Sequence, residues 1–299
     1  CDDGDADIHP DAEECDDGID NDCNGYADDV SVCADTLSDY DTIQDAIDAV
    51  PDGWIVLVCA GEYAENLTFS DQDVTVHGID GAEVTTLQPE DSGTTVVLFD
   101  NTDGSELSSI TVTGGEADAG AGVTARNATA ALTDCIITNN HASEYGGGLW
   151  TVQSSMTTDG TVFSNNTAQI YGGGAFLQDS SGTFTDNTFE DNEALEGGGV
   201  FSYEGNPDFI GNEFAGNHAT TTDEGAWGPG SGGGALWMYG NGTVADNYVH
   251  DNTSAYHAGG MYFYYSGVEF TGNTIENNYG GEDGAGVYFS VSSATIHGN

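Results

Sequence analysis

The first residues of the chain carry the side chains best suited to chemistry. Within residues 1–29, aspartates recur at alternating positions in two stretches, and three cysteines frame them: Cys1, Cys15 and Cys23. Hard cations such as Ca²⁺ take oxygen ligands, which a loop supplies from alternating positions and from a carboxylate at its twelfth place. We therefore expect two Ca²⁺-binding loops; the competing interpretation is a solvated acidic run.

Both loops offer oxygen donors at the required places. The first consists of Asp3, Asp5, Asp7, the His9 carbonyl, Asp11 and Glu14. The second consists of Asp20, Asp22, Asn24, the Tyr26 carbonyl and Asp28, with Gly25 at the bend. Ser31 takes the twelfth place of the second loop, so Asp29 is expected to substitute for it. Ile8 stands where the first loop would need a bend glycine, which departs from EF-hand geometry without removing the oxygen ligands.

The same block resembles the metal-binding repeat of bacterial secreted proteins. The matching segments are Cys1-Asp2-Asp3, Pro10 and Ala12, Glu14-Cys15-Asp16, and Asp20-Asn21-Asp22-Cys23-Asn24-Gly25. That family includes a copper-binding surface protein of methanotrophs, so the resemblance implies copper as an alternative metal. Oxygen ligands beside disulfide-bonded cysteines favour calcium.

Basic groups for catalysis are scarce in this chain. Arg126 is its one Lys or Arg, and its seven histidines show no metal-ligand spacing. Four aspartates recur in the repeats described next, each directly before an asparagine at an expected bend: Asp186, Asp191, Asp246 and Asp251. We interpret them as turn residues. The chain is therefore expected to lack acid–base catalysis.

From Gly120 onward the sequence repeats about every 26 residues. The repeats open at Gly120, Gly146, Gly172, Gly197, Gly232, Ala258 and Gly284. An asparagine recurs at one place in the first six: Asn140, Asn166, Asn192, Asn217, Asn252 and Asn278. A repeat of this length holds about three short strands, and stacked asparagines can hydrogen-bond along the axis as a ladder. The pattern predicts an all-β fold, a right-handed parallel β-helix, over residues 120–299.

The repeats resemble known surface proteins. GGG followed by an apolar residue, and FSNN, FEDN and FAGN, are similar to the GGA(I) and FxxN repeats of chlamydial polymorphic outer-membrane proteins and related bacterial surface β-helices. WIVLVCAGEYAENLTF is similar to the first strands of pectate-lyase-like β-helices. The first resemblance implies a secreted or surface-displayed protein. Lyases of this fold use Arg or Lys as base and as carboxylate clamp, which this composition does not provide.

The repeat and its flanks divide the chain into four parts. Residues 1–33 are expected to form a disulfide- and metal-stabilised module, and 34–53 a linker and capping helix with Ile43, Ala46, Ile47 and Val50 on its apolar face. Residues 54–119 are expected to form irregular early coils, and 120–299 the regular ones, without a C-terminal cap. Cys33–Cys59 is a plausible disulfide, and Cys135 is expected to be a buried thiol.

One column of side chains is expected to point outward. It contains Trp150, Phe176, Phe201, Leu236, Tyr262 and Tyr288. The preceding column is small or aliphatic, as the inside of a narrow solenoid requires: Leu149, Ala175, Val200, Ala235, Met261 and Val287. Strand alternation then turns the aromatic column to the surface, although the opposite phase would bury it. With Trp227 of the insertion 220–231, the column is expected to form one lateral contact surface.

Charge limits the partners. The chain has 52 acidic residues against one Lys or Arg, a formal net charge of −51, which excludes nucleic acid and disfavours anionic membranes. No apolar run is long enough to span a bilayer. We expect a calcium-stabilised, extracellular or cell-surface structural or adhesive protein, self-associating as a filament subunit or meeting a surface partner. The alternative is a β-helix that binds or acts on a neutral polysaccharide or other glycan.

Overall fold

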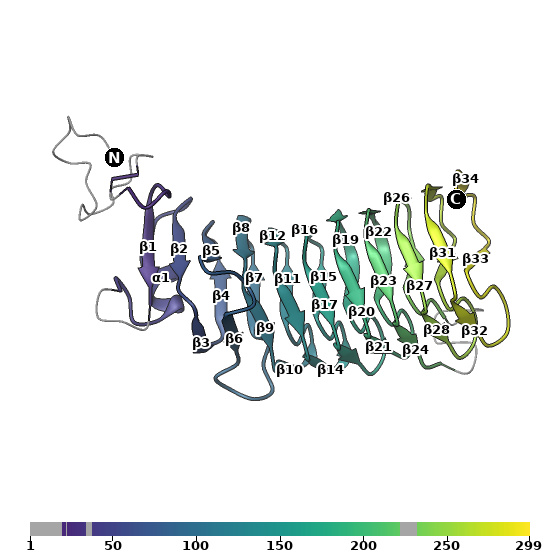
Figure 1. Ribbon diagram of the computed structural model, residues 1–299, viewed down its shortest axis with the longest axis horizontal. Helices are drawn as coiled ribbons and strands as arrows, with labels where there is room; N and C mark the ends of the chain where they lie inside the picture. The colour runs from purple at the N-terminus through teal and green to yellow at the C-terminus, as the bar shows by residue number, and fades with distance from the viewer. Residues whose placement is uncertain (1–19, 22, 34–37, 222–231) are drawn as a thin grey trace.

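The computed structural model is an elongated parallel β-helix (Figure 1) and describes residues 20–21, 23–33, 38–221 and 232–299. Within these residues the strands form three sheets of 18, 9 and 7 strands. Each strand pairs in parallel with its counterpart in the next coil, as β11 (Val123–Arg126) does with β15 (Leu149–Val152). The predicted solenoid is confirmed.

The 18-stranded sheet contains two consecutive segments of each coil. One series consists of β1 (Asp29–Val32), β2 (Ile55–Val58), β5 (Thr75–Gly78), β8 (Asp103–Ser108), β12 (Thr129–Thr133), β16 (Ser155–Asp159), β26 (Thr243–Ala245), β30 (Glu269–Thr271) and β34 (Thr295–His297). The other consists of β4 (Leu67–Ser70), β7 (Val97–Asp100), β11, β15, β25 (Leu236–Tyr239), β29 (Met261–Tyr264) and β33 (Val287–Ser290). Two long strands belong to both series and join them: β19 (Ala175–Thr185) and β22 (Val200–Ile210).

Two further sheets close each coil. The 9-stranded sheet consists of β3 (Gly61–Ala64), β6 (Thr85–Gln88), β9 (Thr111–Thr113), β13 (Ile136–Thr138), β17 (Val162–Ser164), β20 (Thr188–Glu190), β23 (Glu213–Ala215), β27 (Tyr248–His250) and β31 (Thr274–Glu276). The 7-stranded sheet consists of β10 (Glu116–Ala119), β14 (His141–Tyr145), β18 (Thr167–Ala168), β21 (Glu193–Ala194), β24 (His218–Ala219), β28 (Thr253–Ser254) and β32 (Tyr279–Gly280).

Ladders of like residues hold the coils in register. The Asn166 Nδ2 group donates to Oδ1 of Asn192 in the next coil (3.1 Å) and to the backbone carbonyl of Ile137 in the previous coil (2.8 Å). The same arrangement recurs at each predicted ladder asparagine from Asn140 to Asn252. The hydrogen-bonding groups of these buried side-chain amides are thus paired along the solenoid axis. The ladder fixes the turn at which the asparagines lie, and no glycine is needed there.

The core is built from stacked rings inside the coils. Phe163, Phe189 and Phe214 are fully buried. Their ring centroids are 4.8 and 5.0 Å apart, and their planes are nearly parallel. Burial of each such side chain stabilises the fold by about 1.5–3 kcal/mol. Because every coil repeats the column, core packing and register reinforce one another.

A short helix closes the N-terminal end of the solenoid (Figure 1). Helix α1 (Ile43–Ala49) begins after Thr42, whose Oγ1 accepts from the Asp45 N–H, and it buries Ile43, Ala46 and Ile47. The carboxylate of Glu65 accepts from the backbone N–H groups of two first-turn residues at 3.1 Å. The helix packs on β1, β2 and β4, so it covers the open apolar end of the core.

The cysteines that the structure describes follow the predictions. Cys33 and Cys59 form a disulfide with Cα atoms 5.0 Å apart. Cys135 is a free, buried thiol, and burial raises its pKa to about 12, so it is not a reactive thiolate. The boundary of the N-terminal module shifts, however, because β1 begins at Asp29 and pairs with β2 as part of the solenoid. No helix in the described part of the chain combines the length and apolarity that crossing a membrane would require.

The predicted register is wrong by one residue at the longest coil. Coil openings take positive φ, and the opening after Gly197 (φ +62) is Gly233 (φ +68) rather than Gly232. The Gly197 N–H donates to the Gly232 carbonyl, as the Gly146 N–H donates to that of Tyr171. Gly232 therefore precedes the opening. The insertion hid this shift because the sequence there reads GGGA, in which several glycines could open the coil.

Candidate functional site

The aromatic column lies on the outer face of the 18-stranded sheet. In β19, Ala175 and Leu177 point into the solenoid core, whereas Phe176 between them joins a separate aromatic cluster. Strand alternation produces this division.

The shifted register changes one member of the column. Leu236 pairs with Val200 and Met261 and belongs to the core. Trp237 takes the outward place, between Phe201 and Tyr262. Trp227, the other tryptophan predicted for this surface, lies outside the described residues.

The middle of the column is also less exposed than a protruding stripe would be. Phe176, Phe201, Trp237 and Tyr262 are at most 5% exposed. The rings of Phe201 and Trp237 lie face to face, 4.1 Å apart, so each covers the other. Trp150 and Tyr288 remain partly exposed. The column therefore forms a recessed floor on the surface rather than a protruding stripe.

Side chains from neighbouring positions form walls on both sides of this floor. On one side, the Tyr145 and Tyr171 rings stack at 5.7 Å, and Tyr171 lies 4.3 Å from Phe201. On the other side, Tyr203 and Tyr239 stack at 5.4 Å. We call the column and these walls the aromatic groove. It runs along the solenoid axis because its residues come from successive coils.

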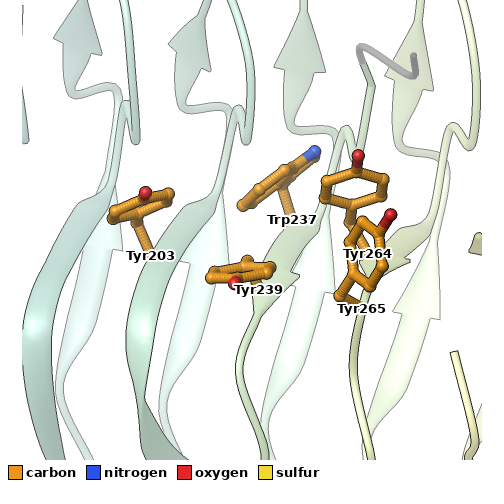
Figure 2. Close-up of a pocket in the computed structure, with 5 residues that line it drawn as sticks. All are labelled: Tyr203, Trp237, Tyr239, Tyr264 and Tyr265. Carbon is orange, nitrogen blue, oxygen red and sulfur yellow. The ribbon is translucent and has the colours of Figure 1, made fainter. Parts of the chain in front are cut away.

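A cavity of about 170 Å³ lies in the groove over Trp237. Figure 2 shows its lining: Tyr203, Trp237, Tyr239, Tyr264 and Tyr265. We call it the Trp237 cavity. Trp237 is 2% exposed, and its Nε1–H has no hydrogen-bond partner among the described residues. In Figure 2 this nitrogen lies at the ring edge nearest Tyr264, whose ring centroid is 6.3 Å from that of Trp237.

Tyr265 stands at the mouth of the Trp237 cavity in a costly conformation. It is 55% exposed and has φ +47. The corresponding turn places of earlier coils hold Asn127, Gln153, Asp179 and Glu204, also at positive φ. A bulky aromatic residue is unusual in this left-handed region, and such strain concentrates at ligand-binding positions.

A second cavity of about 130 Å³ lies further toward the N-terminal end of the groove. Its lining consists of Tyr145, Tyr171, Phe176, Gln178, Phe201 and Tyr203. We call it the Phe176 cavity. Gln178 supplies an amide, and the tyrosines supply hydroxyl groups that can both donate and accept.

Burial keeps three tyrosine hydroxyls of the groove protonated, those of Tyr203, Tyr262 and Tyr264. Burial, followed by the nearby Glu204 carboxylate, raises the pKa of Tyr203. Burial and then Tyr265 raise the pKa of Tyr264, and burial raises the pKa of Tyr262 to about 12. At neutral pH these groups are therefore neutral hydrogen-bonding partners rather than bases.

A third cavity, on the 7-stranded sheet, is polar. It measures about 320 Å³, and its lining includes Asp118, His141 and Ser143. The Ser143 hydroxyl donates to Asp118 (2.7 Å), while Nδ1 of His141 is 2.7 Å from Oγ1 of Thr167. The serine is thus paired with a carboxylate rather than with the imidazole, so these residues do not form the Ser–His pair of a catalytic triad.

The recurrent aspartates occupy turns. Asp186, Asp191, Asp246 and Asp251 have φ between +51 and +57. Each directly precedes an asparagine whose side-chain amide donates to an asparagine in the next coil: Asn187, Asn192, Asn247 and Asn252. Aspartate tolerates this conformation better than most residues, so their recurrence has a structural cause.

The predicted metal ligands are only partly described. Asp3, Asp5, Asp7, Asp11, Glu14 and Asp22 lie outside the described residues. Gly25 bends the second loop with φ +103, and its N–H donates to Oδ2 of Asp20 (3.0 Å). Asn24 Nδ2 donates to Oδ2 of Asp29 at 3.0 Å. Among the described residues, no group of three or more His, Cys, Asp or Glu side chains is placed to hold a metal ion.

Comparison with known proteins identifies the fold. Residues 62–217 and 155–299 match the family model for the "Right handed beta helix region". No curated protein sequence matches the chain.

Solved structures resemble it at low identity. ORF18 of Geobacillus virus E2 is 15% identical with a TM-score of 0.43, over 89% of this chain and 60% of that chain, so this chain spans less than two thirds of that protein. Pectin methylesterase from carrot is 12% identical with a TM-score of 0.44, over 90% and 88% of the two chains. Pectin methylesterase from Aspergillus niger is 14% identical with a TM-score of 0.34, over 91% of each chain. These similarities concern the fold alone.

Proposed function

The chain belongs to the right-handed β-helix family, and on that premise we propose that it binds a neutral, linear polysaccharide along its aromatic groove. The Trp237 cavity carries the proposal. Trp237 in its lining has an indole N–H that is buried without a partner among the described residues, so a ligand reaches it only after a neighbouring side chain moves. Such a group costs about 1–3 kcal/mol, and a ligand hydroxyl that accepted from it would remove that cost.

The chemistry of the groove suits a sugar chain. Ligand sites are mostly aromatic or apolar with a few placed polar groups, and the groove combines aromatic rings with tyrosine hydroxyls and the Gln178 amide. A pyranose offers C–H faces to the first and hydroxyls to the second. Because the groove follows the axis over several coils, an extended chain fits it better than a compact molecule.

Charge restricts the sugar. With a net charge of −51, the protein repels anionic polymers, especially at low ionic strength. The proposed ligand is therefore an uncharged polysaccharide rather than a uronic-acid polymer.

We propose binding without bond cleavage. The described residues that line the two groove cavities are tyrosines, other aromatics and Gln178. The raised pKa values of Tyr203 and Tyr264 prevent these two side chains from acting as bases at neutral pH. General acid–base catalysis needs a group with a pKa near the working pH, which these side chains do not supply.

Affinity electrophoresis tests the proposal. Wild-type protein should be retarded in gels that contain hydroxyethylcellulose, xylan or galactomannan, but not in gels that contain polygalacturonate. Tyr239→Ala should lose retardation, while Tyr248→Ala, on the outer face of the 9-stranded sheet, should keep it. Equal migration of the wild type in all gels would contradict the proposal.

A second candidate is a calcium-stabilised, cell-surface adhesive protein. The hydrogen bond from Gly25 N–H to Asp20 favours it, because it joins the first and sixth places of a cation-binding loop as EF-hand geometry requires. Asp20, Asn24 and Asp28 would then contribute oxygen ligands. Ca²⁺ at 100 times its Kd would raise stability by about 2.7 kcal/mol. Thermal melts with Ca²⁺ and with chelator at fixed ionic strength test this, and a midpoint that does not move would argue against it.

A further inference from the structure

Tyr203 lines both groove cavities. Its ring stands between the Phe176 cavity and the Trp237 cavity, and it stacks on Tyr239 at 5.4 Å. Beneath it, the Phe201 and Trp237 rings form a continuous floor. We propose that Tyr203 divides the groove into two adjacent subsites, each for one sugar ring, so that the groove selects linear chains of at least two units. This inference rests on the proposed function.

The cavity volumes set the size of each unit. A cavity of about 150 Å³ accommodates one benzene molecule. The two cavities measure about 130 and 170 Å³, so neither has room for two six-membered rings. A disaccharide would therefore fill both only by passing Tyr203.

The two subsites differ in their polar groups. The Trp237 cavity offers an indole donor that has no acceptor among the described residues. The Phe176 cavity offers the Gln178 amide, which can both donate and accept. A chain bound across Tyr203 thus meets different partners at its two ends, so the groove distinguishes the direction of the chain.

Calorimetry with short oligosaccharides tests the inference. The probes are gluco-, xylo- and manno-oligosaccharides of one to four β-1,4-linked units. For the wild type, affinity should rise roughly tenfold from one unit to two, which is the gain from one further desolvated ring, and should then level off. Tyr203→Ala should reduce this step to roughly threefold or less, and Tyr203→Phe should preserve it.

A second variant keeps the inference testable if Tyr203→Ala does not fold. Tyr265→Asn changes only the Trp237 cavity and suits the local backbone, so it should bring the affinity for two units down toward that for one. An affinity that rises evenly from one to four units, or a full step in Tyr203→Ala, would overturn the two-subsite arrangement while leaving the proposed function intact. Failure of the wild type to bind any of these probes or any neutral polymer would overturn both.

Discussion

The indole of Trp237 lies 4.1 Å from the ring of Phe201 in the preceding coil, with the two planes 4° apart. This stack occupies a face of the indole, so Trp237 reaches the groove mainly by its edge. The edge carries the Nε1–H, one of several buried polar groups without a hydrogen-bond partner among the described residues. The account of function depends on this relationship.

Replacing Trp237 by phenylalanine keeps a stacking ring and removes the donor. We expect Trp237→Phe to weaken oligosaccharide binding roughly two- to tenfold, because one hydrogen bond contributes about 0.5–1.5 kcal/mol. Isothermal calorimetry measures the change. Trp54→Phe is the matched control: its Nε1 is also buried without a partner among the described residues, but Trp54 packs in the solenoid core and not in the groove, so binding should not change. Equal losses in both variants would contradict the assignment.

Tyr265 should show a conflict between stability and binding. Because φ is +47 there, Tyr265→Asn is expected to stabilise the fold by about 1 kcal/mol and to weaken ligand binding. Val291→Asn supplies the control, since Val291 occupies the same turn place in the next coil with φ +52 and lies outside both cavities. It should stabilise the fold and leave affinity unchanged. Thermal melts measure the change in stability of both variants, and calorimetry measures the change in their affinity for the oligosaccharide.

Acidic turn residues are separated by glycine along one edge of the solenoid. Asp186 precedes Gly211 in the next coil, and a Cβ added at Gly211 would lie 2.4 Å from the Asp186 Oδ1 atom. Gly211→Ala is therefore expected to destabilise the protein by about 2–3 kcal/mol, from the clash and from φ +71. Gly298→Ala is the control, because φ is +73 there but nothing lies closer than 3.8 Å. A similar loss in both variants, measured by denaturant unfolding, would show that the carboxylate makes no difference.

His250 contacts two carboxylates, as a Lys or Arg side chain would in a less acidic protein. Its Nε2 is 2.9 Å from Glu213 and its Nδ1 is 2.8 Å from Asp251, and it stacks on Tyr248. Desolvation lowers the pKa of His250, but the hydrogen bonds to Asp251 and Glu213 outweigh it, so the net shift is upward from 6.5.

The raised pKa has a defined consequence for stability. The contribution of His250 is fully present below pH 6.5, the unfolded-state value, and is lost as pH rises through the folded-state value. His250→Gln should therefore lower the melting temperature below pH 6.5 and have little effect at pH 9. His297→Gln, at the exposed strand β34, should change little at either pH. A constant difference between His250→Gln and wild type across this range would contradict the ion pairs.

Much of the fold could be predicted from the sequence because a solenoid repeats its constraints. Asn192 is specified by the same ladder as Asn166 and Asn217, and each copy confirms the others. The helix at 43–49 follows from Thr42 as cap and from the spacing of Ile43, Ala46 and Ile47. The predicted register was wrong only after the insertion, where GGGA allows two alignments. That one-residue error placed Leu236 in the outward column, where the structure has Trp237.

The site was harder to predict because it depends on side chains that repeat poorly. The outward column could be located, but not its burial, which results from flanking residues such as Tyr171 and Tyr203. Tyr239 and Tyr264 stand two residues after column members, and this spacing could have identified a second aromatic row. The positive φ of Tyr265 could have been inferred only from its alignment with Asn127 and Asp179.

The most direct test is a crystal structure of the protein with a neutral β-1,4-linked tetrasaccharide. The account predicts a sugar chain along the aromatic groove, with one ring on each side of Tyr203 and a hydroxyl oxygen within hydrogen-bond distance of the Trp237 Nε1 atom. A tetrasaccharide bound elsewhere on the solenoid, or a groove that stays empty at saturating ligand, would contradict it.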